Sequence, residues 1–322
     1  MKAVRVHSQG GPDALIFEEI ATPMVSATDV LVKIEAVGVN FIDTYQRSGL
    51  YQIPLPSTLG LEGSGTVDSV GKDVTRFKKG DRVAYTNIPG AYAEFAAVPE
   101  DKLVNLPATV SFNQGAAILL QGCTAHFLCH STYSVKPGDV CLVHTAAGGV
   151  GLLLTQMITM LGATVIATVS TQAKATLAKA AGADHTILYT EIDFEAAVKT
   201  LTGGKGVNVA FDSVGKTTFE KSINCLKSLG TMVLYGNASG PVTEFNPTSL
   251  GRKGSLFLTR PTIFDYLADR ETLEWRSADL FRWIAQGKLK LRLEHCYPLM
   301  QASIAHAALE GRATTGKIIL NP

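Results

Sequence analysis

The chain has 322 residues, of which 46% are hydrophobic and 18% are charged, and its formal net charge is +1. That length allows two domains with sizeable cores, and the near-neutral charge without a long basic run argues against a dedicated nucleic-acid-binding surface. Five cysteines with no C-x-x-C pair favour a reducing compartment over a disulfide scaffold or metal site, so we expect a cytoplasmic protein.

The N-terminal third of the chain consists mainly of predicted strands and turns. Its opening, MKAVRVH, alternates apolar and polar residues as a strand does and lacks the apolar core of a signal peptide. Alternating segments separated by glycine, proline and charged turns predict an antiparallel or barrel-like domain, with strands at 29–39, 65–70, 81–85 and 92–98. We expect a short helix at 41–48 and two helices, 111–120 and 124–133, that lead out of this domain.

From residue 140 the pattern changes to alternating strands and helices. Glycines 162, 182 and 230 are expected to end helices in a left-handed cap. Crossover helices between successive strands predict a doubly wound parallel sheet, with six strands at 140–145, 164–169, 186–189, 207–211, 231–235 and 255–259. Residues 140–173 carry no charge, but glycines divide the run, so it is interpreted as a buried β-α-β unit and not as a membrane span.

After residue 260 the alternation ends. A helical stretch at 262–286 stops at Gly287 and is followed by KLKLRLEH, another helix and the strand KIIL. These pieces are too few for a third core, so we expect them to return to the first domain. The predicted boundaries are 1–123 with 262–322 for the first domain and 124–261 for the second.

The segment HTAAGGVG, residues 144–151, follows the first strand of the alternating region and opens its first helix. It reads A-x-G-x-x-G, with Ala146 where a dinucleotide-binding turn usually has its first glycine. Gly148 would let the backbone approach a pyrophosphate, and Gly151 would let helix and strand pack closely. A tight turn without a ligand is the alternative, but the six strands that accompany the motif favour dinucleotide binding.

The end of the second strand indicates which dinucleotide binds. An NAD site would place Asp or Glu about 20 residues after the turn, but here the strand is followed by Ser170, then TQA, then Lys174. A hydroxyl, a backbone turn and an ammonium attract a 2′-phosphate that a carboxylate would repel. The sequence therefore predicts NADPH, with the alternative that Ser170 caps the next helix and Lys174 is a surface charge.

Taken together, these motifs resemble the medium-chain dehydrogenase/reductase superfamily, and within it the zinc-free NADPH:quinone oxidoreductases similar to zeta-crystallin. The resemblance spans nearly the whole chain and implies a six-stranded Rossmann sheet plus a discontinuous, mainly-β GroES-like catalytic domain. It rests on HTAAGGVG and on GVNFIDTYQRSGLY (38–51), GLEGSGTVDSVG (60–71), GDRVAY (80–85), QGCTA (121–125), DSVG (212–215) and YGNASG (235–240).

The zinc ligands of related alcohol dehydrogenases are missing. The places where those enzymes have a cysteine and a histidine correspond to Asn40 and Leu61 in this chain, and the four-cysteine structural lobe is absent. Glu62 alone does not make a metal site. We therefore expect no metal, and hydride transfer to an acceptor that is already electrophilic, such as a quinone or a conjugated enone.

The resemblance also implies site residues. Asn40 and Tyr45 would donate hydrogen bonds to the nicotinamide carboxamide or to an acceptor oxygen, and Tyr51 would form an aromatic wall for a flat quinone. The residues implied to contact NADPH are Asn40, Phe41, Asp43, Tyr45, Thr124, Gly148, Gly149, Val150, Ser170, Lys174, Tyr189, Ser213, Asn237, Ser239, Leu258, Thr259 and Arg312.

Other functions stay open at this point. A 2-alkenal or enoyl reductase would share the fold and the hydride donor but reduce a conjugated C=C bond. A crystallin-like structural role or an RNA-binding role belongs to another class. The near-neutral charge disfavours nucleic acid as the main partner, and the full set of cofactor motifs favours catalysis. A homodimer is expected through the apolar final strand of the sheet, 255–259, because an unpaired edge invites a defined partner.

Overall fold

The computed structural model describes all 322 residues and divides into two compact units. Unit 1 comprises Met1–Cys123 and Leu267–Pro322, and unit 2 comprises Thr124–Tyr266. The chain returns to unit 1 slightly later than the sequence pattern suggests. The short helix α8 (Ile263–Tyr266) stays with unit 2, since the ring of Tyr266 stacks on Phe127 with centroids 4.3 Å apart.

Unit 2 is built on a parallel sheet of six strands in the order β11-β10-β9-β12-β13-β14. Every neighbouring pair is parallel, which confirms the predicted doubly wound sheet. The order reverses direction between β9 and β12, the point where such sheets bind ligands. The strands are β9 (Val140–Val143), β10 (Thr164–Val169), β11 (His185–Leu188), β12 (Val207–Asp212), β13 (Leu226–Leu234) and β14 (Phe257–Thr259).

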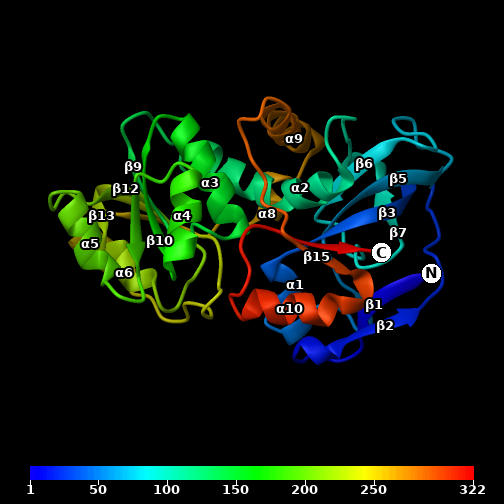
Figure 1. Cartoon of the computed structure of the whole chain (residues 1–322), viewed down its shortest axis with the longest axis horizontal. Coiled ribbons are helices and arrows are strands. Elements are labelled where there is room, and N and C mark those ends of the chain that lie inside the picture. The colour runs from blue at the N-terminus through cyan, green and yellow to red at the C-terminus, as the bar shows by residue number, and fades with distance from the viewer. The chain divides into compact units, whose positions relative to one another are not determined.

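Helices connect these strands, and in Figure 1 α3 and α4 lie against the green part of the sheet. Gly162 and Gly182 have φ of 78° and 104°, so both act as left-handed helix ends as predicted. The prediction for Gly230 was wrong: it lies inside β13, because Leu226 and Met232 on either side belong to the core of the sheet. The helices are α3 (Gly149–Met160), α4 (Gln172–Ala180), α5 (Phe194–Leu201), α6 (Phe219–Asn224) and α7 (Thr248–Arg252).

Unit 1 is mainly β, as expected. A seven-stranded sheet has the order β15-β16-β3-β5-β6-β8, with β7 pairing to β3, and a second sheet has the order β2-β1-β4. Valine, leucine and tyrosine side chains of both sheets share one core. The strands are β1 (Lys2–Val6), β2 (Leu15–Glu19), β3 (Asp29–Val39), β4 (Ser57–Thr58), β5 (Glu62–Val70), β6 (Arg82–Thr86), β7 (Phe95–Pro99), β8 (Leu103–Asn105), β15 (His295–Pro298) and β16 (Ile318–Asn321).

The remaining helices differ from prediction in two places. One helix, α2 (Phe112–Phe127), continues into a π-helical turn at Leu128–Thr132 and replaces the two helices expected there. The stretch expected at 262–286 is divided into α8 and α9 (Arg270–Ala285), since the Asp269 carboxylate accepts the Thr272 N–H at 2.8 Å and starts a new helix. The other helices are α1 (Phe41–Ser48) and α10 (Ala302–Glu310). None of the helices has the length and apolar character needed to cross a bilayer.

Candidate functional site

The turn between β9 and α3 depends on an unusual threonine. Thr145 has φ of 52°, in the left-handed region that β-branched residues rarely adopt. Its Oγ1 donates to the carbonyl of His144 at 2.7 Å and lies 2.7 Å from Oγ of Ser213, at the end of β12. Ala146, with no exposed surface, does not have positive φ. Alanine is therefore tolerated in the place of the first glycine because the residue before it makes the sharp turn.

The two remaining glycines of the motif, Gly148 and Gly151, have different structural roles. A Cβ added to Gly151 would overlap the carbonyl oxygen of Thr145, so close helix–strand packing requires glycine there. A Cβ at Gly148 would meet only that same oxygen, at 3.2 Å. Gly148 is the N-cap of α3 and provides no side-chain cap bond. The first N–H groups of α3 and the positive end of its dipole therefore fit an anionic pyrophosphate.

At the end of β10, the residues suited to a 2′-phosphate lie next to each other. The parallel register pairs Val169 with Leu188, so Ser170 and Tyr189 follow at the same edge of the sheet. Thr171 is the N-cap of α4, and its Oγ1 accepts the N–H of Lys174 at 3.3 Å. The alternative that Ser170 caps this helix is therefore wrong, and no carboxylate lies between Ser170 and Lys174.

The loops that follow β12 and β13 support each other. The hydroxyl of Ser239 donates to the carbonyl of Val214 at 2.8 Å and accepts the N–H of Thr217 at 3.1 Å. The N–H next to Asn237, that of Ala238, donates to the carbonyl of Ser213 at 3.2 Å. Ser239 thus braces the loops, which places Ser213 and Asn237 at the carboxyl edge of the sheet.

Three other expected contacts in unit 2 lie on a helix and a strand. Leu258 packs against the core of the sheet, and Thr259 ends β14. Thr124, at the start of unit 2, is 8% exposed. All three therefore sit on regular elements, Thr124 on α2 and the other two on β14.

A buried polar network next to the turn between β9 and α3 was not anticipated from the sequence. His144 is 1% exposed, and its Nδ1 and Nε2 lie 2.9 Å from hydroxyls of Thr168 and Ser222. Ser222 donates to the Asp212 carboxylate at 2.9 Å, so it accepts from Nε2. Burial lowers the pKa of His144. Because the carboxylate bonds to the serine and not to the imidazole, this network is no catalytic triad; it holds the ends of β9 and β12 together.

In unit 1, three of the expected residues form an aromatic cluster on and after α1. The rings of Tyr45 and Tyr51 meet edge to face with centroids 5.2 Å apart, and Phe41 lies 6.1 Å from Tyr45. The N–H of Tyr51 donates to the carbonyl of Tyr45 at 3.0 Å, which holds the two side chains together. Such rings offer the flat apolar contact that a planar acceptor requires.

Asn40, directly before α1, takes part in a buried ion-pair cluster that the motifs did not indicate. The ammonium of Lys317 lies 2.7 Å from Oδ1 of Asn40 and 2.5 Å from Oε2 of Glu62. All three residues are at most 3% exposed, and burial lowers the pKa of Lys317 while the carboxylate opposes that shift. A zinc ion does not fit here, since an amide, a carboxylate already held by an ammonium, and the apolar Leu61 replace the ligands it prefers.

Asp43 is fully buried, so its carboxylate faces the protein interior. Its Oδ2 accepts the N–H of Asn40 at 2.8 Å and the hydroxyl of Tyr92 at 3.0 Å, whereas Oδ1 has no partner. Burial raises the pKa of Asp43 to about 7, against the lowering effect of the two hydrogen bonds. Asp43 therefore positions the start of α1, and its side chain is poorly placed to contact a cofactor.

The Tyr92 hydroxyl extends this network to α10. It lies 2.9 Å from Nε2 of His306, whose Nδ1 lies 3.2 Å from the Arg47 guanidinium. Because Arg47 can only donate and Tyr92 donates to Asp43, His306 carries its proton on Nε2. Burial and the Arg47 charge lower the pKa of His306 to about 3, so it is neutral. Arg47 also binds Glu310, at 2.7 Å, at the end of α10.

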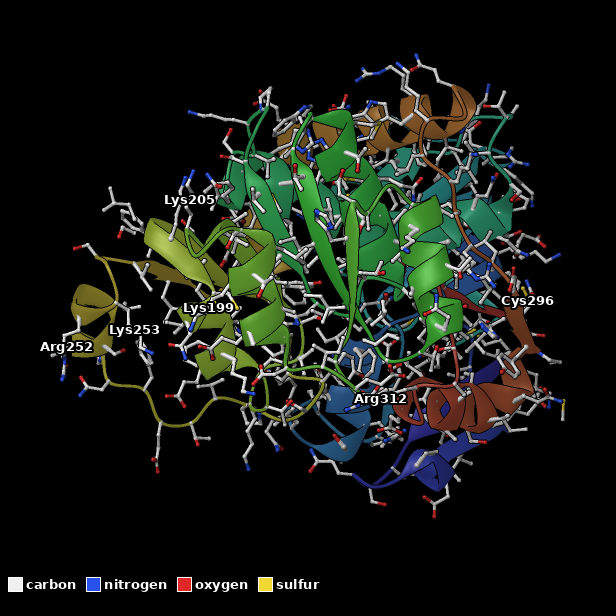
Figure 2. The ribbon with its side chains drawn as sticks, turned by 60° about the vertical axis from the view of Figure 1, so that its left-hand side comes forward. Lys199, Lys205, Arg252, Lys253, Cys296 and Arg312 are labelled. Carbon is white, nitrogen blue, oxygen red and sulfur yellow. The ribbon has the colours of Figure 1, made fainter.

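Arg312, the last of the expected contacts, follows α10 on an exposed turn. Its own backbone has φ of 57°, and its N–H donates to the carbonyl of Leu309 at 3.2 Å. Figure 2 shows the labelled side chain below the centre of the molecule, at the turn between the helix and the last strand.

Two family models match the chain: "Alcohol dehydrogenase GroES-like domain" over residues 26–108 and "Zinc-binding dehydrogenase" over residues 149–275. A quinone oxidoreductase from Pseudomonas aeruginosa is 44% identical over 100% of this chain and 99% of its own length. A 2-haloacrylate reductase from a Burkholderia species is 40% identical over 99% of this chain and 98% of its own length. The solved structure of Escherichia coli quinone oxidoreductase complexed with NADPH is 44% identical, covers 100% of both chains and gives a TM-score of 0.98.

Proposed function

Since this chain belongs to the quinone oxidoreductase family of the medium-chain dehydrogenases/reductases, we propose that it reduces quinones by hydride transfer from NADPH. It is an oxidoreductase, and NADPH is its cofactor, as the comparisons with NADPH-bound relatives indicate. The observation in this chain that carries the proposal is the combination of an anion-binding helix start at Gly148 with Ser170 and Lys174 where an NAD site would have a carboxylate.

Each part of the site has a defined task in this proposal. The N–H groups at 148–150 hold the pyrophosphate, and Ser170, Lys174 and Tyr189 hold the 2′-phosphate. Bound NADPH supplies a hydride to the acceptor. Before the transfer, the rings of Tyr45 and Tyr51 would hold a flat acceptor in place, because the protein contributes position and exclusion of water where the cofactor contributes the chemistry.

A second acceptor class has specific support. The Burkholderia relative is named a 2-haloacrylate reductase, which implies a conjugated C=C bond. This alternative needs the same cofactor site and only a different acceptor.

A nucleic-acid-binding role has less support. Lys199, Lys205, Arg252 and Lys253, labelled in Figure 2, are all exposed on unit 2. Of these, Lys199 is paired with Glu195 at 2.5 Å, and Lys253 bonds the Asn224 amide. Interspersed acids and amides divide the positive charge, whereas binding to a phosphate backbone calls for an uninterrupted basic stripe.

A homodimer through the edge of the unit 2 sheet is part of the proposal. β14 ends the strand order, so one of its edges has no neighbour within the sheet. Phe257 on this strand is 60% exposed, while Leu256 is 6% exposed. Two antiparallel copies of β14 about a two-fold axis would satisfy both edges and cover Phe257.

The proposal is tested with a panel of acceptors at fixed NADPH, with cofactor oxidation followed optically. The panel contains benzoquinones and naphthoquinones, 2-alkenals and 2-haloacrylate. Quinones should give the highest kcat/KM. A higher kcat/KM for 2-haloacrylate or an alkenal would show that the enzyme reduces C=C bonds and not quinones. No turnover of any acceptor would refute the proposed function.

A further inference from the structure

Thr145 and Ser213 come together because β9 and β12 are parallel neighbours in the sheet of unit 2. Val143 lies opposite Phe211 in their register, so Thr145 and Ser213 stand opposite each other just beyond the ends of the two strands. Their hydroxyl oxygens are 2.7 Å apart, although the two residues are 68 positions apart in the sequence. This hydroxyl pair therefore joins the turn between β9 and α3 to the loop after β12.

The hydrogen in this contact comes from Ser213. The Thr145 hydroxyl has a single hydrogen, which it donates to the carbonyl of His144 at 2.7 Å, and a carbonyl can only accept. Oγ1 of Thr145 therefore accepts from Ser213, and the two hydrogen bonds together fix the direction of the Thr145 side chain. An alanine in place of Ser213 would leave this side chain with its local bond alone.

The hydroxyl pair holds a residue whose backbone is strained. The φ of Thr145, 52°, is unfavourable for a β-branched residue, and such a conformation persists only where the surrounding structure enforces it. The carbonyl of Thr145 accepts the N–H of Gly148, the N-cap of α3, at 2.8 Å. With β9 fixed, rotation of φ to its ordinary negative range would move both the side chain and this carbonyl. The first N–H groups of α3 would then lose their support.

The loop that carries Ser213 is itself firmly held. The carboxylate of Asp212, which has no exposed surface, accepts the N–H groups of Val214 and Gly215 at 2.7 and 3.0 Å. The carbonyl of Ser213 accepts the N–H of Ala238 at 3.2 Å. These bonds fix the backbone on both sides of Ser213, so its hydroxyl is a rigid donor toward the neighbouring turn.

We propose that Ser213 is a positioning residue for the NADPH site: its hydroxyl keeps Thr145 in the left-handed conformation, and Thr145 in turn places the N–H groups of α3 for the pyrophosphate. This inference rests on the proposed function, which puts the pyrophosphate at that helix start. It differs from the direct contact with NADPH that the resemblance implied for Ser213, because the serine acts through Thr145. The effect of Ser213 on affinity therefore depends on which residue stands at position 145.

The test is a double-mutant cycle of Ser213→Ala and Thr145→Gly, with dissociation constants for NADPH measured by titration calorimetry. Alone, Ser213→Ala should weaken NADPH binding about fivefold to tenfold, the value of one net hydrogen bond. Thr145→Gly should bind NADPH within about fivefold of the wild type, since glycine adopts positive φ without steric cost. In the Thr145→Gly background, Ser213→Ala should change the dissociation constant less than about twofold, because glycine needs no support to keep this conformation.

A second ligand separates this role from a contact at the nicotinamide end. Adenosine 2′-phosphate 5′-diphosphate keeps the 2′-phosphate and the diphosphate of NADPH but lacks the nicotinamide riboside. Ser213→Ala should weaken binding of this ligand by the same factor as binding of NADPH. The matched control is Ser228→Ala, at an exposed serine near the beginning of β13 in the same unit. This control should leave both dissociation constants unchanged.

Each outcome decides the question. An equal effect of Ser213→Ala in both backgrounds, or a loss confined to NADPH, would overturn the inference and indicate direct contact between Ser213 and the cofactor. Unchanged affinity in Ser213→Ala, or loss of NADPH binding in Thr145→Gly, would also overturn it, because the site would then not depend on a left-handed residue held by the serine. Failure of the wild type to bind NADPH at all would refute the proposed cofactor, and the inference with it.

Discussion

Replacing Asp43 by asparagine should change the pH dependence of stability in a direction fixed by burial. The pKa of Asp43 is raised from its ordinary value of 3.8 to about 7, chiefly because the carboxylate is buried. Between these two pH values the folded protein binds a proton that the unfolded chain has lost. The free energy of unfolding therefore falls as the pH rises from about 4 to about 7, by about 1.4 kcal/mol per pH unit.

His306, in the same network, has the opposite effect on the pH dependence of stability. Its pKa is lowered from 6.5 to about 3, so the folded protein binds one proton fewer than the unfolded chain between these values. Its contribution to stability rises with pH over this range and is lost as the pH falls below 6.5. In the wild type, the opposite effects of Asp43 and His306 on the pH dependence of stability largely cancel. A variant that removes one of the two groups therefore exposes the effect of the other.

In Asp43→Asn, the amide oxygen still accepts from Asn40 and Tyr92, so the local structure should persist. The free energy of unfolding of the variant, measured relative to that of the wild type, should increase by about 3 kcal/mol from pH 5 to pH 8. This value is the product of the two pH units between pH 5 and the pKa of Asp43 and about 1.4 kcal/mol per unit. The burial of an NH2 group where Oδ1 has no partner adds a cost that is equal at both pH values.

The assay is urea unfolding at pH 5 and pH 8 followed by tryptophan fluorescence. Both tryptophans, Trp275 and Trp283, lie on α9 in unit 1, so the signal reports the unit that contains Asp43. The control is Asp68→Asn, which removes a carboxylate that is 42% exposed and paired with Lys79 at 3.5 Å. A stability difference between Asp43→Asn and wild type that is the same at both pH values would refute the reasoning.

Three further predictions concern the cofactor, the metal and assembly. Lys174→Ala should weaken NADPH binding by roughly 1.5–3 kcal/mol and leave NADH binding nearly unchanged in titration calorimetry; equal affinity of the wild type for the two cofactors would contradict the prediction. Elemental analysis should find far less than one zinc per chain and chelators should leave activity intact, whereas stoichiometric zinc lost together with activity would overturn the argument from Asn40 and Leu61. Light scattering should give a dimer for the wild type and a monomer for Phe257→Lys, which places a charge on the apolar edge strand; a monomeric, fully active wild type would exclude the dimer.

Local patterns in the sequence were sufficient for the architecture of unit 2. Strand–helix alternation and glycine-terminated helices predicted six strands and their crossover connections, because a right-handed β-α-β unit leaves few alternatives. The same local chemistry predicted the NADPH site, since the phosphate turn and the residues after β10 are contiguous in sequence. Errors appeared where tertiary packing outweighed local preference, as at Gly230, which pairing within the sheet keeps in a strand.

The polar networks of unit 1 were decided by tertiary structure alone. Nothing near Asn40 in the sequence indicates that Lys317 will hold its amide, or that His306 will join Tyr92 and Asp43. Hydrophobic periodicity determines which face of a strand is buried, but the partner of a buried polar atom is set by the register of strands far apart in the chain. The sequence by itself therefore determined the fold and the cofactor. Tertiary structure decided the direction of each buried hydrogen bond, because that direction depends on all the donors and acceptors that packing brings together.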